Sequence, residues 1–418
     1  MINLQYIIKK AEAAKLASKV MSKVTTHQKN ECLKFMIKML YEDKEYILSE
    51  NMKDVNSAMC NGMSEPMIDR LLLNEKRLDA IALCLEQLIS LKDPIGEVIS
   101  MNRMPNGLLI GQMRVPLGVI GIIYESRPNV TVDAASLCIK SGNVVILRGG
   151  SEAINSNIAL VKSLRKALAL SGLPEDFISI IEDTSRDTVN NFMKLNQYID
   201  VLIPRGSAGL IKATKENSSI PVIETGTGNC HIYVDSYSNL QMAERIIINA
   251  KVSRPGACNS AEKLLIHQDI ANIFVPLIVK SLKNSGVEVR GCEKVKQICD
   301  DIILASDTDW YTEYLDYIIS IKIVDNIDEA IEHINKYGTM HSEAIVTENY
   351  PNSQKFLMEI DASAVYINAS TRFTDGSEFG LGAEIGISTQ KLHARGPMGL
   401  RELTSTKYII YGSGQIRS

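Results

Sequence analysis

Cys258 is the residue whose surroundings best suit covalent chemistry. It lies in Val252-Ser253-Arg254-Pro255-Gly256-Ala257-Cys258-Asn259-Ser260, where a Pro-Gly turn follows the end of an amphipathic helix. The thiolate is the nucleophilic form of cysteine, and a nearby arginine favours it over the thiol. Such a thiolate can attack a carbonyl carbon, as redox chemistry at the aldehyde level requires. The other cysteines fit inert core packing, whereas for Cys258 the local sequence supports a catalytic and a structural role about equally.

Two glycine-containing turns could hold phosphate groups. Arg148-Gly149-Gly150-Ser151 and Arg205-Gly206-Ser207 each follow an apolar strand and open a helix. Small residues at a helix N-terminus let anions approach backbone N–H donors. A single turn of this kind would fit an ordinary connection between a strand and a helix, and the full Gly-x-Gly-x-x-Gly pattern is absent. Two such turns in one sheet, however, favour nucleotide binding. Arg148, where the ribose of a dinucleotide would lie, indicates a 2′-phosphate and therefore NADP.

The sequence leaves the roles of three further polar residues open. Glu224 follows a strand in Glu224-Thr225-Gly226-Thr227-Gly228-Asn229, and it either places a carboxylate beside the thiol or is solvated. His333 and His341 lie near a glycine turn at Tyr337-Gly338-Thr339. Because a lone histidine is more often structural or exposed than catalytic, neither is assigned the role of a base.

The elements that must position these residues alternate between strand and helix from Val119 onward. Short apolar strands separated by amphipathic helices predict a parallel doubly wound sheet. The expected strands are Val119–Tyr124, Val144–Leu147, Phe177–Ile181, Val201–Ile203, Val222–Ile223 and His231–Val234. The expected helices include Glu152–Leu170 and Asp187–Asn196, and Ser238-Asn239-Leu240-Gln241 is a capping box for the helix that leads to Cys258. Later strands, expected at Lys263–Ile266, Ile318–Val324, Ala344–Val346 and Ala364–Ile367, predict a second α/β domain.

Helices and a hairpin are expected before the first strand. Residues 1 to about 93 show helical spacing, with one helix ending at Asn61-Gly62 and the next starting at Ser64-Glu65-Pro66. Pro105-Asn106-Gly107 predicts a hairpin over residues 97–115. The last strand, Lys407–Tyr411, has no obvious local partner. Because both features would expose strand edges in a monomer, strand exchange in a homo-oligomer is expected.

Length and composition fit a cytoplasmic enzyme. The 418 residues predict two or three domains, since single cores stop growing at roughly 250–300 residues. The net charge of −4, without a block of like charge, gives no sign of nucleic-acid binding. The longest apolar run is too short and glycine-rich to cross a membrane. The eight cysteines show no zinc spacing, so we expect reduced thiols and no metal site.

A series of motifs follows in order along nearly the whole chain. They are Val115–Gly121, Tyr124-Glu125-Ser126-Arg127-Pro128-Asn129-Val130-Thr131, Arg254-Pro255-Gly256 with Cys258, Val324–Ala330, His333-Ile334, Tyr337-Gly338-Thr339, His341-Ser342-Glu343 with Ile345, Phe373-Thr374-Asp375-Gly376, Glu378–Gly386 and His393-Ala394-Arg395-Gly396-Pro397. With these motifs the chain resembles the gamma-glutamyl phosphate reductase family of the aldehyde dehydrogenase superfamily. The resemblance implies an aldehyde-dehydrogenase-like α/β fold with two doubly wound parallel-sheet domains and a small β oligomerisation flap. It implies an NADP-binding domain over residues 1–95 and 116–253, a catalytic domain over 254–400, and a flap from 96–115 and 401–418.

The same resemblance implies an activity. It is the NADPH-dependent reduction of L-glutamyl 5-phosphate to L-glutamate 5-semialdehyde and phosphate in proline biosynthesis, with Cys258 forming a thioester. The implied cofactor-binding residues are Arg148, Gly149, Ser151, Gly206, Ser207 and Glu313. The substrate-binding candidates are Arg127, Arg254, His341 and Arg372, although the arginines also fit a surface role. Ser126 stands where most aldehyde dehydrogenases have an oxyanion-hole Asn, and Glu224 matches their water-activating Glu, a role that a phosphate-exchanging reductase does not need.

The remaining expectations concern partners and rival functions. A small-molecule substrate and a homo-oligomer, dimer or tetramer, are expected, and a transient contact with glutamate 5-kinase stays open. The nearest rival function is another thiol-dependent dehydrogenase, either hydrolytic or CoA-acylating. A catalytically silent dinucleotide-binding protein is the alternative from another class.

Overall fold

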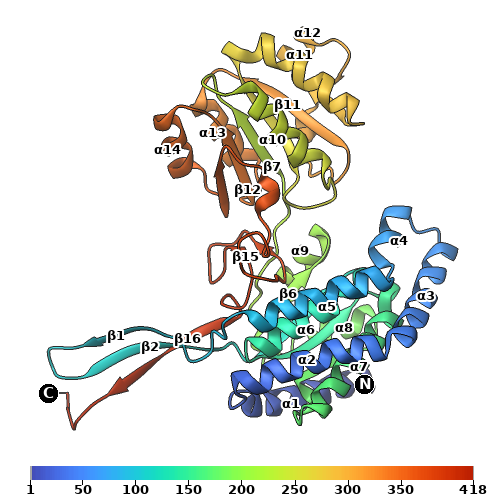
Figure 1. The fold of residues 1–418 in the computed structure, drawn as a ribbon, viewed down its shortest axis with the longest axis vertical. Helices are drawn as coiled ribbons and strands as arrows, with labels where there is room; N and C mark the ends of the chain where they lie inside the picture. Colours follow the sequence, from blue (N-terminus) through green and yellow to red (C-terminus); the bar gives the residue numbers. More distant parts are fainter. Residues whose placement is uncertain (1, 418) are drawn as a thin grey trace. The chain divides into compact units, whose positions relative to one another are not determined.

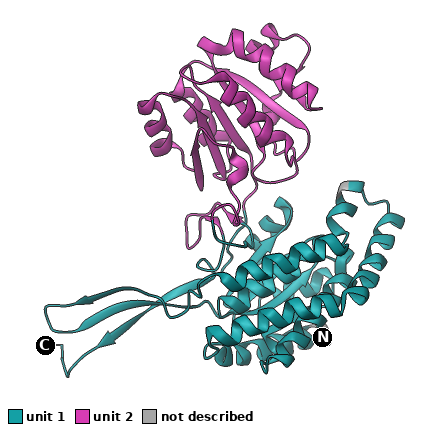
Figure 2. Cartoon of the chain, viewed as in Figure 1, with its two compact units in different colours: residues 1–225, 380–386, 398–418 teal, residues 226–379, 387–397 magenta. Residues whose placement is uncertain are grey.

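The structure, a computed structural model, describes residues 2–417 and divides the chain into two compact units (Figure 2). The first unit comprises residues up to Thr225, residues 380–386 and residues from Met398 onward. The second comprises residues 226–379 and 387–397. The terminal residues 1 and 418 of the expected domains lie outside the described part.

A four-stranded parallel sheet forms the centre of the first unit, in the order β5-β4-β3-β6 (Figure 1). Its strands are β3 (Val119–Tyr124), β4 (Val144–Gly149), β5 (Ile178–Ile180) and β6 (Val201–Arg205). Every residue of β3 is buried, as its uninterrupted apolar run predicts. This strand order is that of a mononucleotide-binding half. In such a half the ligand crevice lies beyond the carboxyl ends of the strands where the order reverses, here β3 and β6.

Helices pack around this sheet in layers. Helices α6 (Pro128–Lys140) and α7 (Ile154–Leu170) connect its strands, and α2 (Thr26–Glu42), α3 (Lys44–Cys60) and α5 (Glu75–Ser90) pack against them. The other helical segments of the unit are α1 (Ile2–Met21), α4 (Glu65–Leu71), η1 (Ser151–Ala153), η2 (Glu175–Phe177), α8 (Arg186–Phe192) and α9 (Ala208–Asn217). As predicted, α3 ends just before Asn61-Gly62 and Ser64 is the N-cap of α4.

A seven-stranded parallel sheet forms the centre of the second unit, in the order β10-β9-β11-β8-β7-β12-β13. Its strands are β7 (Cys230–Val234), β8 (Ala261–His267), β9 (Glu288–Gly291), β10 (Ile303–Leu304), β11 (Ile318–Val324), β12 (Ser342–Val346) and β13 (Ala364–Ile367). Ile232 and Val234 pack with α10 (Leu240–Val252) and α11 (Gln268–Asn284), whereas Tyr233 packs with α13 (Ile327–Tyr337) and α14 (Tyr350–Glu359). Helices therefore cover both faces, and the predicted α/β class is confirmed. The remaining elements are α12 (Glu293–Ile298), η3 (Asp307–Trp310), η4 (Thr371–Phe373), β14 (Ile387–Ser388) and β15 (Gly396–Pro397).

Four details differ from the sequence prediction. Strand β7 pairs with β8 and β12, so β7 and α10 belong to the second unit, which begins at residue 226 rather than 254. The predicted strand Val222–Ile223 forms only an isolated bridge between Val222 and Leu202. Strands β9 and β10 were not predicted, because β9 carries charged residues and β10 has only two residues. The side chain of Asn239, not that of Ser238, caps α10.

A three-stranded antiparallel sheet extends the first unit, in the order β1-β2-β16 (Figure 1). The predicted hairpin forms β1 (Val98–Arg103) and β2 (Leu109–Pro116), and β16 (Thr404–Tyr411) pairs with β2. The C-terminal strand thus finds its partner within its own chain. Both outer strands of this sheet, β1 and β16, carry exposed apolar side chains, among them Val98 and Ile410. None of the described helices combines the length and apolar character needed to cross a membrane.

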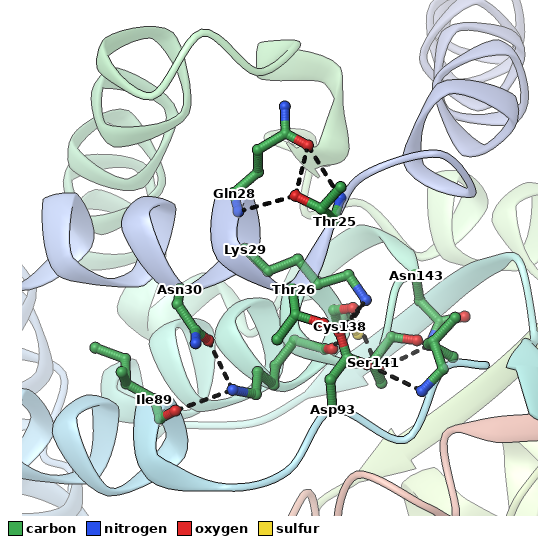
Figure 3. Close-up of polar contacts among 12 residues, drawn as sticks. Thr25, Thr26, Gln28, Lys29, Asn30, Ile89, Asp93, Cys138, Ser141 and Asn143 are labelled. Carbon is green, nitrogen blue, oxygen red and sulfur yellow. Dashed lines mark hydrogen bonds and ion pairs between the residues drawn. The ribbon is translucent and has the colours of Figure 1, made fainter. Parts of the chain in front are cut away.

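A buried ion pair fixes the base of the antiparallel sheet. The Lys29 ammonium on α2 lies 2.9 Å from an Asp93 carboxylate oxygen, and both side chains are buried (Figure 3). The other Asp93 oxygen accepts from the Ile95 N–H, which leads into β1. On the opposite side, Asn143 accepts from the Gly118 N–H and donates to the Leu403 carbonyl just before β16. These bonds connect the segment before β1 to α2 and the segment before β16 to the turn that follows α6.

We expect Lys29→Met to lower the free energy of unfolding by about 3–5 kcal/mol, because it leaves the Asp93 carboxylate buried without its cation. Urea denaturation of the full chain measures this change. The matched control is Lys34→Met, which breaks the exposed pair of Lys34 with Glu31 and should cost at most about 1 kcal/mol. Equal stability of the two variants would show that the buried pair contributes nothing.

Candidate active site

Cys258 lies in the bend between α10 and β8, at the amino end of the seven-stranded sheet. Helix α10 ends at Val252, and the chain then turns through residues 253–260 before β8 begins at Ala261. Cys258 is half-buried, whereas Cys230 and Cys138 are completely buried. The bend thus keeps Cys258 out of the sealed core.

The carbonyl oxygen of Cys258 is held tightly against the start of β7. A Cβ atom at Gly228 would lie 1.4 Å from this oxygen, so only glycine fits there. The Cys230 thiol donates to the same oxygen at 3.2 Å. The Gly228 N–H donates to Glu313 Oε1 at 2.7 Å, which brings the predicted cofactor ligand Glu313 to the cysteine bend. Burial raises the pKa of the Glu313 carboxyl, and the bond from Gly228 opposes this rise.

Two arginines accompany Cys258. Arg372, from η4, is half-buried, and Arg254 is exposed. Burial lowers the pKa of Arg372, the positive charge of Arg254 lowers it further, and the Cys258 thiolate acts in the opposite direction. Two of the predicted substrate-binding arginines therefore share one electrostatic environment with the thiol. Cationic groups beside a thiolate stabilise it and attract anions.

His341 lies beneath the surface in a chain of hydroxyl groups. Its Nδ1 is 2.8 Å from the Ser342 hydroxyl, which contacts the Thr374 hydroxyl at 2.6 Å. The Tyr366 hydroxyl also contacts Thr374, at 2.7 Å. His341 has 0% of its surface exposed, so it cannot touch a substrate in this conformation. The position of His341 suits a residue that supports the site from below better than one that contacts the substrate, which is the role that the sequence predicted.

The predicted residues of the first unit lie at the carboxyl ends of β3, β4 and β6. Both the N–H and the hydroxyl of Ser126 donate to Glu152 Oε1, at 2.7 and 2.6 Å. Ser126 has a φ of 35°, a conformation unusual for a residue with a side chain. The sequence pattern indicated an oxyanion donor and did not reveal this carboxylate partner. Arg127 is the N-cap of α6 and is half-buried.

A second carboxylate meets the N-terminus of α9. Glu125 accepts from the Ser207 N–H at 2.7 Å and from its hydroxyl at 2.9 Å. Gly206 allows this approach, because a Cβ there would lie 2.5 Å from the Glu125 carboxylate. Ser151, Gly206 and Ser207 are exposed. The donors predicted for phosphate are thus accessible, but those of Ser207 are engaged by an internal anion.

Arg148 offers a buried donor that the protein does not use. Its Nη2 donates to the Thr184 carbonyl at 2.6 Å, and its Nε is buried without a hydrogen-bond partner. Burial lowers the pKa of this guanidinium. Arg148 and the adjacent Gly149 lie at the carboxyl end of β4, next to the strands where the order reverses, and this residue set fits the phosphate and ribose of a dinucleotide. Glu224 pairs with Lys215 at 2.9 Å, which favours a structural role for it.

A layer of buried charges at the amino ends of the second sheet was not foreseen. Lys251 and Glu262 form a completely buried pair at 3.3 Å. Desolvation raises the pKa of Glu262 to about 7, and desolvation lowers that of the adjacent Lys263 to about 8. The signal that could have revealed this layer is Glu262-Lys263 inside the otherwise apolar strand β8. Among residues 2–417, no group of three or more His, Cys, Asp or Glu side chains could hold a metal ion.

His333 belongs to an aromatic cluster beside these charges. Its ring lies 5.4 Å from that of Trp310 and 4.5 Å from that of Tyr337. Lys322 Nζ is 3.5 Å from His333 Nδ1, a contact that suits a neutral ring with an acceptor nitrogen. Desolvation, followed by the positive charges of His231 and Lys322, lowers the pKa of His333 to about 2. This histidine is structural, in agreement with the more common role of lone histidines.

The two parallel α/β sheets, one of them with the strand order of a mononucleotide-binding half, define the fold class of the chain, and comparison with known proteins agrees. The model of the aldehyde dehydrogenase family matches residues 3–295. Gamma-glutamyl phosphate reductase of Clostridium botulinum (strain Eklund 17B / Type B) is 63% identical over 414 residues, covering 99% of this chain and 100% of that protein. The corresponding protein of Clostridium perfringens (strain SM101 / Type A) is 61% identical over 411 residues, covering 98% and 99%.

Solved structures give the same result. The crystal structure of gamma-glutamyl phosphate reductase from Thermotoga maritima has 53% sequence identity and a TM-score of 0.96, covering 98% of this chain and 99% of that one. An acetylating aldehyde dehydrogenase from Geobacillus thermoglucosidasius shares the fold, with a TM-score of 0.71 at 17% identity over 100% and 98% of the two chains. The chain therefore belongs to the aldehyde dehydrogenase family, in the group of the gamma-glutamyl phosphate reductases. Membership makes it an oxidoreductase that uses a nicotinamide cofactor.

We expect His333→Phe to reduce the loss of stability that acid causes. A histidine in the unfolded chain takes up its proton near pH 6.5, whereas folded His333 does so only near pH 2. The unfolded state therefore binds more protons between these values, and stability falls as the pH drops below 6.5. Phenylalanine keeps the ring packing and removes this titration.

Urea denaturation at pH 7.5, 6.5 and 5.5 measures the effect. The slope of unfolding free energy against pH should decrease by up to about 1.4 kcal/mol per pH unit below pH 6.5. An unchanged slope would mean that His333 already protonates in the folded protein.

Proposed function

We propose that the protein reduces L-glutamyl 5-phosphate to L-glutamate 5-semialdehyde and phosphate, with NADPH as the reductant, in proline biosynthesis. The observation that carries this proposal is the half-buried Cys258, which interacts electrostatically with Arg372 and whose carbonyl packs against Gly228, the residue that donates to Glu313. The names of relatives at 60–63% identity support the choice of substrate. An acyl phosphate is anionic, and the positive charges of Arg254 and Arg372 would favour its binding.

Cys258 provides the nucleophile in this mechanism. Its thiolate attacks the acyl carbon, the bond from that carbon to the phosphate oxygen breaks, and phosphate leaves with the electron pair. The product is a thioester on Cys258. NADPH, when bound, would supply the hydride that reduces this thioester. Collapse of the resulting thiohemiacetal anion would expel the Cys258 thiolate and release the semialdehyde.

The chain's own groups stabilise the charges that develop. Arg254 and Arg372 would hold the phosphate, with Arg127 as a further candidate for the substrate carboxylate. The Cys258 N–H would stabilise the oxyanion, a contribution of roughly 3–4 kcal/mol for one such donor. The Ser126 hydroxyl could donate to the oxyanion as well, but only after it breaks its hydrogen bond to Glu152. Glu224, paired with Lys215, takes no part as a base.

The first unit would hold the cofactor. We assign Arg148 to the 2′-phosphate, Gly149 and Ser151 to the turn around it, and Gly206 and Ser207 to the remaining phosphates. Ser207 can donate to them only when Glu125 moves away. Glu313, in the second unit, would hold the nicotinamide ribose through the oxygen that Gly228 leaves available.

Assembly and location complete the proposal. The β1-β2-β16 sheet would mediate a homo-oligomer, dimer or tetramer, because its two outer strands expose apolar side chains. The eight free cysteines fit a reducing, cytoplasmic location. A transient contact with glutamate 5-kinase, which would hand over the labile acyl phosphate, stays a prediction.

Cys258→Ser should abolish phosphate-dependent reduction of NADP by glutamate semialdehyde, because a hydroxyl is a far weaker nucleophile than a thiolate. Fluorescence titration should show unchanged NADPH binding. The matched control is Cys60→Ser, which alters an exposed thiol on α3 and should retain full turnover. Near-normal turnover by Cys258→Ser would exclude the thioester mechanism.

The same assay separates the rival functions. Wild-type enzyme is assayed with phosphate, with CoA and with neither. Dependence on phosphate supports the proposal, dependence on CoA indicates an acylating enzyme, and activity with neither indicates a hydrolytic one. Nucleotide binding without any turnover would indicate a silent binding protein.

Arg148→Ala should raise the KM for NADP by roughly 10–100-fold and change the KM for NAD little, since a charge-assisted hydrogen bond contributes about 1.5–3 kcal/mol. Steady-state kinetics with NADP and with NAD measure the two KM values. The control is Arg165→Ala, which removes an arginine of the same unit that pairs with Glu175. Equal increases for both cofactors would show that Arg148 does not read the 2′-phosphate.

A further inference from the structure

Asn259, the residue after Cys258, links the cysteine bend to η4. It is buried, with 4% of its surface exposed. Its side-chain Nδ2 donates to the carbonyl of Thr374 at 2.9 Å and to that of Arg372 at 3.3 Å. Its backbone carbonyl accepts from the Thr371 hydroxyl at 2.7 Å. One side chain and its own peptide thus hold a segment that lies more than a hundred residues away in the sequence.

The same side chain contacts the guanidinium of Arg372. Arg372 Nη1 donates to Asn259 Oδ1, and Arg372 Nε donates to the Ser253 hydroxyl at 3.2 Å. Ser253 and Asn259 flank Cys258 in the sequence. The guanidinium is therefore fixed by the two ends of the bend that carries the nucleophile.

Asparagine suits this position for a chemical reason. The site requires an acceptor for the guanidinium and two donors for backbone carbonyls, and a primary amide supplies both from one side chain. Aspartate would supply no donor when ionised, and alanine would supply neither. Loss of these bonds would leave the carbonyls of Thr374 and Arg372 without the amide donor, and the guanidinium would keep only its bond to Ser253.

We propose that Asn259 is a positioning residue that aims the Arg372 guanidinium at the anionic leaving group of the substrate. This inference rests on the proposed function, because it assigns a phosphate to the cationic environment of Cys258. Asn259 itself does not touch the substrate. It acts through Arg372, whose orientation determines whether phosphate is bound where Cys258 reacts. Small misplacements of such groups can reduce rates by about a hundredfold.

A double-mutant cycle on full-length enzyme tests the proposal, with the KM for inorganic phosphate in the oxidative direction as readout. Asn259→Ala should raise this KM about tenfold and leave the KM for the semialdehyde unchanged. Arg372→Ala should raise it at least as much. Because Asn259 acts through Arg372, the double variant should be no worse than Arg372→Ala alone. Fully additive effects would overturn the proposal and assign Asn259 a general structural role.

Asn143→Ala is the matched control for loss of a buried amide. Asn143 is also fully buried and also donates to a backbone carbonyl, that of Leu403, but it belongs to the first unit. Its replacement should lower stability without changing the KM for phosphate. If Asn143→Ala raises this KM as much as Asn259→Ala does, general destabilisation explains both results and the proposal is wrong.

Thiol alkylation separates this inference from the proposed function. Iodoacetamide reacts with Cys258, and bound phosphate should slow that reaction in wild-type enzyme at least threefold but not in Asn259→Ala. Equal protection of both proteins would contradict the inference while leaving the proposed function intact. Protection confined to wild type, without phosphate-dependent turnover, would support the inference and contradict the function.

Discussion

The close contact between Gly228 and the carbonyl oxygen of Cys258 is the constraint on which the site depends. Since a Cβ at residue 228 would lie 1.4 Å from that oxygen, the chain can place the two backbones together only with glycine. The contact fixes the peptide of Cys258 against β7. The N–H of Gly228 donates to Glu313, so one glycine brings together the proposed nucleophile and a proposed cofactor-binding residue.

The buried charges beneath this bend are costly, and their arrangement limits that cost. Lys251 and Glu262 form a pair, and Lys263 donates to the Thr312 carbonyl at 2.7 Å. Buried pairs add little stability compared with apolar residues, but removal of one partner is strongly destabilising. The Lys29–Asp93 pair under the antiparallel sheet follows the same rule. In both units, therefore, buried ions fix the geometry of a segment more than they add stability.

Much of the fold was predictable because its signals are local. The apolar run of β3 and the turn at Pro105-Asn106-Gly107 predict their structures from neighbouring residues alone. The boundary between the units was misplaced, since nothing local in β7 indicates that its hydrogen-bonding partners are β8 and β12. The same limit applies to the site. The turn that carries Cys258 was predictable from its Pro-Gly pair, whereas the contacts of Ser126 with Glu152 and of Asn259 with Arg372 join residues that only the folded chain brings together.

Core packing was expected for every cysteine except Cys258, but only Cys32, Cys138 and Cys230 are buried, whereas Cys60 is exposed and Cys84, Cys292 and Cys299 are half-buried. Burial raises the pKa of Cys32 to about 11, and burial also raises the pKa of Cys138 and of Cys230 far above the ordinary range. These thiols stay protonated at neutral pH and cannot act as nucleophiles. Cys230, at the start of β7, donates to the carbonyl of Cys258, yet it is buried whereas Cys258 is half-buried. Partial exposure together with two nearby arginines is therefore the feature on which the proposed role of Cys258 depends.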